Sequence, residues 1–290
     1  MKEPLVSVIM NCYNGSQFLR ESINSVYAQT YNNWEIIFWD NGSTDNSSEI
    51  AQSYGHKLKY FLSKKNTNLG IAREMAIRQA SGDYIAFLDC DDFWYKNKLA
   101  LQIPLFQDSS VGLVYSNYWI KNKKIKKISS RVKLPFGYIL DKLLHSYSVG
   151  FLTVIIRRDA ISNKDVFFDT RYNIIHDFDL IINISINWKF ACVQDPLACY
   201  RYHEKNETIK KIDEYIKELE FWINENESNL GISLQKSFYR KKDMLLYLKG
   251  KEMVKKGNRV AALFYLYKIS FCMEKFKLFV IIVLPKYMVN

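Results

Sequence analysis

The sequence predicts an α/β fold in which a mostly parallel sheet is flanked by helices and followed by a helical extension at the carboxyl end. The first part of the chain alternates short apolar runs with segments of helical periodicity, which is the pattern of parallel strands joined by crossover helices. The apolar runs are nearly continuous, as expected for strands covered on both faces. From about residue 206 the chain reads as charged helices, so we place a boundary there.

The first part of the chain is the most regular. Its predicted strands are 5–10, 34–39, 58–62 and 84–88, and its predicted helices are 18–29, 45–54 and 71–80. In a parallel sheet the loops after the strands meet at the carboxyl edge, where α/β folds bind ligands. The polar loops expected at that edge are 11–15, 40–45 and 89–92.

The pattern changes after about residue 110. Longer apolar and alternating runs predict further strands, one pair of which can form a hairpin with a basic turn. The strands are predicted at 111–120, 125–132, 151–156, 190–193 and 197–203, with one helix at 178–187.

The net charge of +11 favours anionic partners such as nucleotide phosphates or an acidic membrane surface. Many of the basic residues lie in 121–133 and 236–259, and charge runs of this kind are usually solvated faces. No nucleic-acid reading module can be recognised, so no nucleic-acid partner is expected.

The five cysteines lack the spacing of a zinc or redox motif and are interpreted as reduced residues of a cytosolic protein. The amino terminus does not resemble a signal peptide. The longest apolar stretch, 278–285, is too short to cross a bilayer. We therefore expect a cytoplasmic protein, either free or peripheral on the inner face of the cell membrane.

Three carboxylates lie within four residues directly after the predicted strand 84–88: Asp89, Asp91 and Asp92. Their mutual repulsion is relieved if a divalent cation binds there, because hard cations prefer oxygen ligands. The alternative for an isolated Asp-x-Asp is a polar loop leaving a strand.

Five ordered motifs extend this observation: 6–14, Asp40-Asn41-Gly42-Ser43-Thr44-Asp45, Asn68-Leu69-Gly70-Ile71-Ala72-Arg73, 82–92 and Tyr200-Arg201-Tyr202-His203. Together they resemble a family 2 glycosyltransferase of the GT-A fold over residues 4–206. The resemblance implies transfer of a sugar, with inversion, from a nucleotide diphosphate donor to a hydroxyl of a glycan or lipid-linked acceptor. It suits an enzyme of bacterial surface-polysaccharide synthesis.

The resemblance also implies roles for the acidic loop. Asp91 is the expected direct metal ligand, and Asp89 is the expected contact to the donor ribose or to a metal-bound water. For Asp92 three roles stay open: it binds the metal directly, it contacts the metal's ligands, or it lies on the acceptor side. An acidic cluster facing a diphosphate indicates Mn²⁺ or Mg²⁺.

For the nucleotide, the resemblance implies that Tyr13 packs near the base and that Asp40 and Asn41 lie at its edge. The family commonly has two acids at this point. The amide oxygen of Asn41 can still accept a hydrogen bond from a uracil N–H, so uridine is the first expectation, with turn formation as the alternative for Asp40. The other residues expected to bind the nucleotide sugar are Asn11, Asn68 and Arg73.

An inverting transfer needs a base for the acceptor proton. The resemblance assigns this role to Asp177, where His176 replaces the usual Glu, with Asp179 in reserve. The alternative is that both acids cap the helix at 178–187. Arg201 is expected to clamp the pyrophosphate, and His203 to contact metal or phosphate.

The resemblance divides residues 1–206 into a nucleotide-binding half, 1–110, and an acceptor-binding half, 111–206. The extension, 207–290, is expected to pack on the catalytic domain, to form a homodimer, or to rest on an anionic membrane. Two other functions stay open at this point. One is a sugar nucleotidyltransferase, although the phosphate loop typical of that class is missing. The other is a non-catalytic partner of another transferase.

Overall fold

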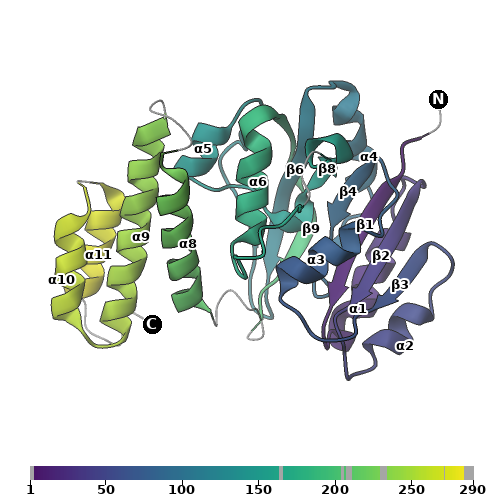
Figure 1. Cartoon of the computed structure of the whole chain (residues 1–290), viewed down its shortest axis with the longest axis horizontal. Helices are drawn as coiled ribbons and strands as arrows, with labels where there is room; N and C mark the ends of the chain where they lie inside the picture. The colour runs from purple at the N-terminus through teal and green to yellow at the C-terminus, as the bar shows by residue number, and fades with distance from the viewer. Residues whose placement is uncertain are drawn as a thin grey trace. The chain divides into compact units, whose positions relative to one another are not determined.

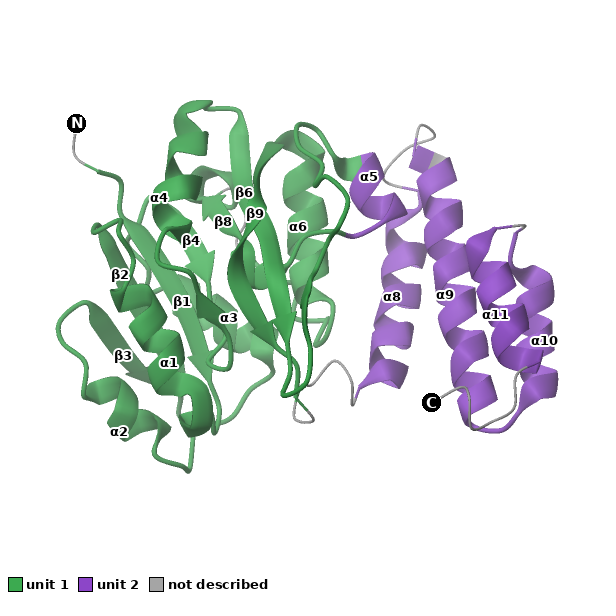
Figure 2. Ribbon diagram, turned by 180° about the vertical axis from the view of Figure 1, so that it is seen from behind, with its two compact units in different colours: residues 1–140, 148–206 green, residues 141–147, 207–290 purple. Residues whose placement is uncertain are grey.

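The computed structural model describes residues 3–162, 166–203, 206, 211–228, 234–270 and 272–283. The chain forms two compact units. Unit 1 comprises residues 1–140 and 148–206, and unit 2 comprises residues 141–147 and 207–290 (Figure 2). The segment 141–147 therefore belongs with the helices, and not with the half of the chain to which the sequence analysis assigned it.

Unit 1 is built on a nine-stranded sheet with the order β3-β2-β1-β4-β8-β6-β9-β5, and β7 pairs with β6 (Figure 1). The strands are β1 Val6–Cys12, β2 Trp34–Asp40, β3 Leu58–Leu62, β4 Tyr84–Phe87, β5 Phe93–Trp94, β6 Val111–Lys121, β7 Lys126–Ile128, β8 Ile155–Arg157 and β9 Lys189–Arg201. This arrangement confirms the predicted α/β fold with its largely parallel sheet.

Strand direction decides which loops can share a site. Strands β1 to β4 are parallel, β8 is antiparallel to both β4 and β6, and β6 is parallel to β9. Strands β1 to β4, β6 and β9 therefore all end at one edge of the sheet. The loops after β1, β2 and β4 meet there, together with the residues that follow β9.

Helices cover both faces of the sheet. Figure 1 shows α3 and α6 on one face, and Figure 2 shows α1 and α2 on the other. Alternate residues of β1 point to opposite faces, so that Val8 packs in the cluster with α1 whereas Ile9 does not. The helices of unit 1 are α1 Ser16–Tyr27, α2 Ser47–Gln52, α3 Leu69–Ile77, α4 Lys98–Gln102 and α6 His176–Asn187.

The strand predicted at 151–156 is wrong in its first half. Residues Phe151–Thr153 form a short 3-10 turn, and only Ile155–Arg157 pair in the sheet. The Thr153 side-chain hydroxyl and backbone N–H both donate to the Gly150 carbonyl, which closes the turn locally. The turn places Phe151 against Phe87 and Arg73. The strands predicted at 190–193 and 197–203 form one strand, β9, whose register with β6 shifts near Pro196.

Glu35 ties three strands together near the opposite edge of the sheet. Its carboxylate accepts hydrogen bonds from Ser7 and Ser81 and pairs with Lys59 at 2.6 Å. Although burial alone would raise the pKa of Glu35, these partners lower it to about 2. A carboxylate with a lowered pKa stabilises the fold above its ordinary pKa, and this stabilisation is lost as the pH falls.

We expect Glu35→Gln to lower the free energy of unfolding at neutral pH by about 2 kcal/mol, because Lys59 loses its ion pair and the serines lose a charged acceptor. Urea titrations at pH values between the ordinary pKa of Glu35, 4.5, and its lowered pKa of about 2 should also show that Glu35→Gln loses less stability with acid than the wild type does. Glu49→Gln, on the exposed side of α2, is the matched control and should change little. Equal acid sensitivity of Glu35→Gln and wild type would contradict the assignment.

Unit 2 is helical and has its own core. Its helices are α5 Leu140–His145, α8 Ile212–Asn226, α9 Gln235–Lys255, α10 Arg259–Lys268 and α11 Met273–Val283. Trp222 of α8 stacks on Phe238 of α9, with ring centroids 6.0 Å apart. Arg240 of α9 contacts His145 of α5 at 2.9 Å, which explains why 141–147 groups with this unit.

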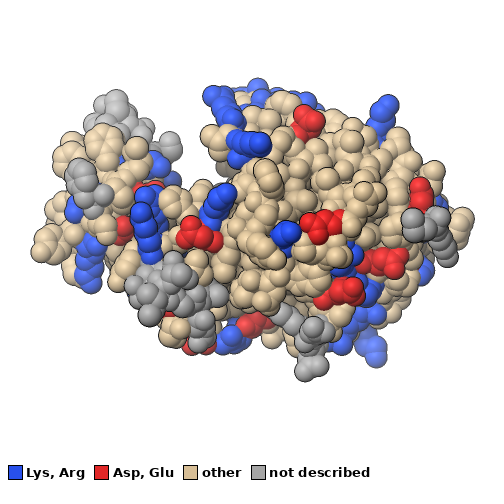
Figure 3. Space-filling model, turned by 90° about the horizontal axis from the view of Figure 1, so that it is seen from above, with Lys and Arg blue, Asp and Glu red and all other residues tan. Residues whose placement is uncertain are grey.

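No helix in the described ranges is long and apolar enough to cross a bilayer. The end of the apolar stretch predicted at 278–285 lies outside the described residues, as do other parts of the extension 207–290. Basic and acidic side chains are both spread over the face of the molecule drawn in Figure 3, and several acidic groups lie beside basic ones there.

Candidate active site

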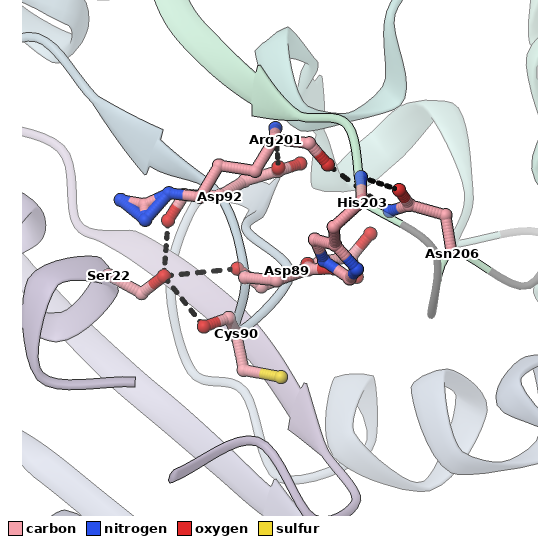
Figure 4. Close-up of polar contacts among 8 residues, drawn as sticks. Ser22, Asp89, Cys90, Asp92, Arg201, His203 and Asn206 are labelled. Atoms are coloured by element: carbon pink, nitrogen blue, oxygen red, sulfur yellow. Dashed lines mark hydrogen bonds and ion pairs between the residues drawn. The ribbon is translucent and has the colours of Figure 1, made fainter. Parts of the chain in front are cut away.

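The acidic loop begins where β4 ends, and a serine of α1 contacts its backbone. The Ser22 hydroxyl of α1 lies within hydrogen-bond distance of the backbone carbonyls of Asp89, Cys90 and Asp92 (Figure 4). The sequence analysis missed Ser22. The sequence signal was a serine next to the apolar positions Leu19, Ile23 and Val26 of the helix predicted at 18–29, and in the structure this serine is buried.

Asp92 is the buried member of the acidic loop, with 1% of its surface exposed. One carboxylate oxygen accepts the backbone N–H of Arg201 at 2.8 Å. Burial raises the pKa of Asp92 well above its usual range, and Asp91 and Asp89 raise it further. Asp92 therefore connects the loop after β4 to the end of β9, and in this conformation its carboxyl group does not reach solvent.

Asp91 of the acidic loop and His203, which follows β9, form a partly exposed pair. Asp91 Oδ2 lies 3.0 Å from His203 Nε2, and about a quarter of each side chain is exposed. Burial raises the pKa of Asp91, and the neighbouring Asp89 acts in the same direction, while His203 lowers it. His203 is oriented by stacking on Phe18 of α1 at 5.5 Å.

Asn206 holds the turn that carries His203, and the sequence analysis did not anticipate it. Its side-chain oxygen accepts the His203 backbone N–H at 2.5 Å, and its amide nitrogen donates to the Arg201 carbonyl at 3.2 Å (Figure 4). Both bonds are local to the turn, so a polar residue shortly after the Tyr-Arg-x-His motif was the only available signal.

The Arg201 guanidinium has a protein partner. It pairs with Glu21 of α1 at 2.6 Å and lies 5.0 Å from the ring of Phe18 and 4.9 Å from the ring of Phe93. In this arrangement the guanidinium fastens β9 to α1. A clamp on the pyrophosphate, as expected from the sequence, stays a prediction, and it would have to use guanidinium N–H groups that do not face Glu21 or displace that pair.

Arg73 connects the acidic loop to helix α6. One guanidinium nitrogen pairs with Asp89 at 2.7 Å, and the other lies 2.7 Å from His176 Nε2. The guanidinium also lies 4.5 Å from the ring of Phe151. Burial, with Arg73 acting in the same direction, lowers the pKa of His176 to about 3. The imidazole is therefore neutral, donating from Nδ1 to the Asn173 carbonyl and accepting from Arg73 at Nε2.

Asp177 lies in the first turn of α6, half-buried beside this network. Burial raises the pKa of its carboxyl group, and Asp89 also acts to raise it, while Arg73 and the Phe178 N–H lower it. Asp177 is thus close enough to the acidic loop to interact with it electrostatically. The reserve candidate, Asp179, is buried and accepts a hydrogen bond from Asn183 at 3.0 Å.

Asp40 and Asn41 are engaged inside the protein. Asp40 is fully buried and accepts hydrogen bonds from the Ser43 N–H and the Tyr60 hydroxyl. The Asn41 amide donates to the Thr67 carbonyl and accepts from the Thr67 N–H and hydroxyl. In this conformation the side chains of both residues are engaged within the protein, and the contacts expected for them at the edge of the base stay predictions.

The other residues predicted to bind the nucleotide differ in their exposure and in whether their polar groups already make hydrogen bonds within the protein. About half of Tyr13 is exposed. Asn68 caps α3 by accepting the Ile71 N–H at 2.8 Å. Asn11 is buried, and its side-chain nitrogen has no hydrogen-bond partner among the described residues. Tyr13 and Asn11 therefore keep groups that a ligand could contact.

Hydrogen bonds that the sequence analysis did not anticipate join the loop after β1 to the loop after β2. Asn14 adopts a positive φ of 53°, and its side-chain oxygen accepts the Thr44 N–H at 2.8 Å. Asp45 accepts the Ser16 N–H at 3.0 Å. Although burial alone would raise the pKa of Asp45, hydrogen bonds from Ser47 and Ser16 lower it to about 2. The Asn14-Gly15 dipeptide was the sequence signal for this turn.

The largely parallel sheet, the Asp-x-Asp loop after β4 and the carboxylate of Asp177 on α6 are the features that the resemblance to glycosyltransferases led us to expect. Residues 7–181 match the family described as glycosyl transferase family 2, and the chain belongs to this family. The predicted resemblance is thereby confirmed, and the chain is a glycosyltransferase.

Curated relatives agree with this assignment. The chain is 30% identical over 210 residues to the β-1,3-glucosyltransferase WfgD of Escherichia coli, covering 72% of this chain and 81% of that protein. WfgD is described as using UDP-Glc and α-D-GlcNAc-diphosphoundecaprenol. The chain is also 31% identical to a putative teichuronic acid biosynthesis glycosyltransferase, TuaG of Bacillus subtilis, over 54% of this chain and 64% of that protein.

Solved structures share the fold. TarS 1–349 of S. aureus in complex with UDP-GlcNAc matches with a TM-score of 0.66 at 17% identity, over 96% of this chain and 79% of that chain. The mannosyltransferase PcManGT of Pyrobaculum calidifontis, in complex with GDP-Man and Mn²⁺, matches with a TM-score of 0.65 at 16% identity, over 97% and 79%. The chain spans 43% of a longer TarS structure.

Proposed function

We propose that this glycosyltransferase moves a hexosyl or N-acetylhexosaminyl group from a UDP-sugar, with inversion, to a hydroxyl of a glycan or lipid-linked acceptor in cell-surface glycan synthesis. The observation that carries the proposal is Arg73, which joins the donor-side Asp89 to the helix of Asp177 within 2.7 Å contacts. The names of WfgD and of the TarS complex support a UDP-sugar donor, and WfgD supports a lipid diphosphate acceptor.

Asp91 and His203 are the residues that would hold Mn²⁺ or Mg²⁺. In the described part of the chain, no three His, Cys, Asp or Glu side chains are gathered as a metal site. A carboxylate and an imidazole 3.0 Å apart and partly exposed nevertheless suit an ion whose other ligands are diphosphate oxygens and water. When bound, the ion would neutralise charge on the leaving diphosphate.

Asp177 would act as the general base. The acceptor oxygen attacks the anomeric carbon, the bond from that carbon to the diphosphate oxygen breaks, and the acceptor proton passes to an Asp177 carboxylate oxygen. Burial raises the pKa of Asp177, which makes the carboxylate a better proton acceptor. The neutral His176 accepts a hydrogen bond from Arg73, so it orients the guanidinium without placing a second positive charge beside it.

His176→Glu should move the acidic limb of the kcat/KM pH profile to higher pH. A glutamate there would pair with Arg73 and put a negative charge beside Asp177, and both changes raise the pKa of the base. The charged groups acting on Asp177 are Arg73 and Asp89. His176→Gln is the neutral control and should leave the limb in place. An unmoved limb in His176→Glu would show that the titrating base is another group.

A turnover assay tests the proposed function. The purified chain, with Mn²⁺, is incubated with a panel of nucleotide sugars, and nucleotide diphosphate release is followed with and without a lipid-diphosphate sugar acceptor. We expect release from a UDP-sugar that is accelerated by the acceptor. Donor binding with no turnover would favour a non-catalytic partner. Pyrophosphate release from a nucleoside triphosphate and a sugar phosphate would favour a nucleotidyltransferase.

A further inference from the structure

Helix α10 is apolar on both of its faces. Its inner face packs around the buried Ala262 in the core of unit 2. The outer face exposes a stripe at the i, i+3, i+4 and i+7 positions of one helix side, Val260, Leu263, Phe264 and Tyr267, whose exposed fractions are 50–86%.

Helix α11 repeats this arrangement. Leu278 and Ile282 are buried in the same core, while Phe276, Phe279 and Val283 on the other side are exposed by 52–63%. A helix that is apolar all round is normally covered on all sides. Two successive helices of this kind, each with an exposed aromatic and aliphatic face, indicate an interaction surface.

The charges on these helices indicate what covers the surface. Residues 259–270 and 272–283 contain four basic side chains and one acid, Glu274. Lys268 lies at the edge of the α10 stripe, 4.3 Å from the ring of Phe264, and Lys277 is exposed on α11. Apolar and aromatic side chains bordered by lysines match the boundary between the acyl chains and anionic headgroups of a bilayer.

We propose that the outer faces of α10 and α11 bind the interface of an anionic phospholipid membrane. With 10 and 11 residues, the helices are too short to span a bilayer and would lie in its plane. In a symmetric dimer this surface would pack against the same surface of a second copy. The basic side chains of the two copies would then repel each other, with only one acid per chain, Glu274, to offset them, and this favours a membrane over a second copy. The proposal rests on the proposed function in one respect, that a lipid-linked acceptor is presented at a membrane.

Vesicle co-sedimentation of the full chain tests the proposal without any activity measurement. We expect the wild type to bind vesicles of phosphatidylcholine with phosphatidylglycerol more tightly than vesicles of phosphatidylcholine alone. Leu263→Ser/Phe264→Ser should weaken binding at least about tenfold, because it removes two apolar side chains from the bilayer contact. Leu62→Ser/Leu101→Ser, which removes two exposed leucines of unit 1, is the matched control and should bind as the wild type does.

Three results would overturn the proposal: no binding to anionic vesicles, equal binding by the α10 variant and the control, or a lipid-free dimer that the α10 variant converts to a monomer in light scattering. The last result would assign the surface to a second copy of the chain. Donor turnover with a water-soluble acceptor should be the same in all variants. Vesicle binding therefore tests this inference and turnover with the soluble acceptor tests the proposed function, so the failure of one can be told from the failure of the other.

Discussion

Asp177→Asn should lower kcat by roughly a hundredfold to ten-thousandfold, the range expected for loss of a general base. The amide keeps the shape of the side chain in the first turn of α6 but cannot accept the acceptor proton. The Asp91–His203 pair, where we propose that the donor diphosphate and its metal bind, is formed without Asp177, so donor affinity measured by calorimetry should stay within a few-fold of wild type.

Asp179→Asn is the matched control for this experiment, because it makes the same chemical change two residues along the same helix. The Asp179 carboxylate is occupied by Asn183, so we expect turnover to be reduced far less than in Asp177→Asn. Normal turnover by Asp177→Asn would remove the base assignment. A larger loss in Asp179→Asn than in Asp177→Asn would transfer the assignment to Asp179.

Asp91→Asn should abolish the metal dependence of donor binding. The substitution leaves an oxygen beside His203 but removes the charge that attracts a divalent cation. We expect the Kd for the UDP-sugar in the presence of Mn²⁺ to rise about a hundredfold, or about 2.8 kcal/mol. Titrations with and without Mn²⁺ measure both quantities, and the two Kd values of the variant should converge.

Asp108→Asn is the control for Asp91→Asn, because it also removes one negative charge from unit 1. Asp108 pairs with Lys189 at the start of β9, at the amino end of that strand, away from the acidic loop. Its donor affinity should keep the metal dependence of wild type. If Asp91→Asn keeps that dependence as well, the ion is held by other residues or is not required.

The strand pattern and the acidic loop could be predicted because their signals are local. The apolar run that ends at Asp89, the crossover helices and the polar loops each depend on residues within a few positions of one another. The misassigned segment 151–156 has the same apolar composition as a strand, and it is the hydrogen bonds to Gly150 that close the first half into a turn. Composition does not distinguish those two outcomes.

The roles of the polar residues were less predictable because they depend on distant partners. Arg73 meets His176 across 103 positions, and Asp92 accepts from Arg201 across 109. Asn41 was expected at the edge of the base, where the family commonly has an acid, yet its side chain makes hydrogen bonds with Thr67. The sequence could identify which side chains had hydrogen-bonding groups, but it could not show which of those groups would be used within the fold.

The sequence by itself therefore determined the class of enzyme and the order of its strands and loops, since apolar periodicity and short motifs are properties of neighbouring residues. Only the tertiary structure decided that Arg73 connects Asp89 to the helix of Asp177, that Asp92 is a buried anchor, and that a second apolar face of α10 is exposed in the part of the chain that the structure describes. The physical reason is that burial and charge pairing arise between segments that are distant in the sequence, up to about a hundred residues apart, and only the packing of the whole fold brings such segments together.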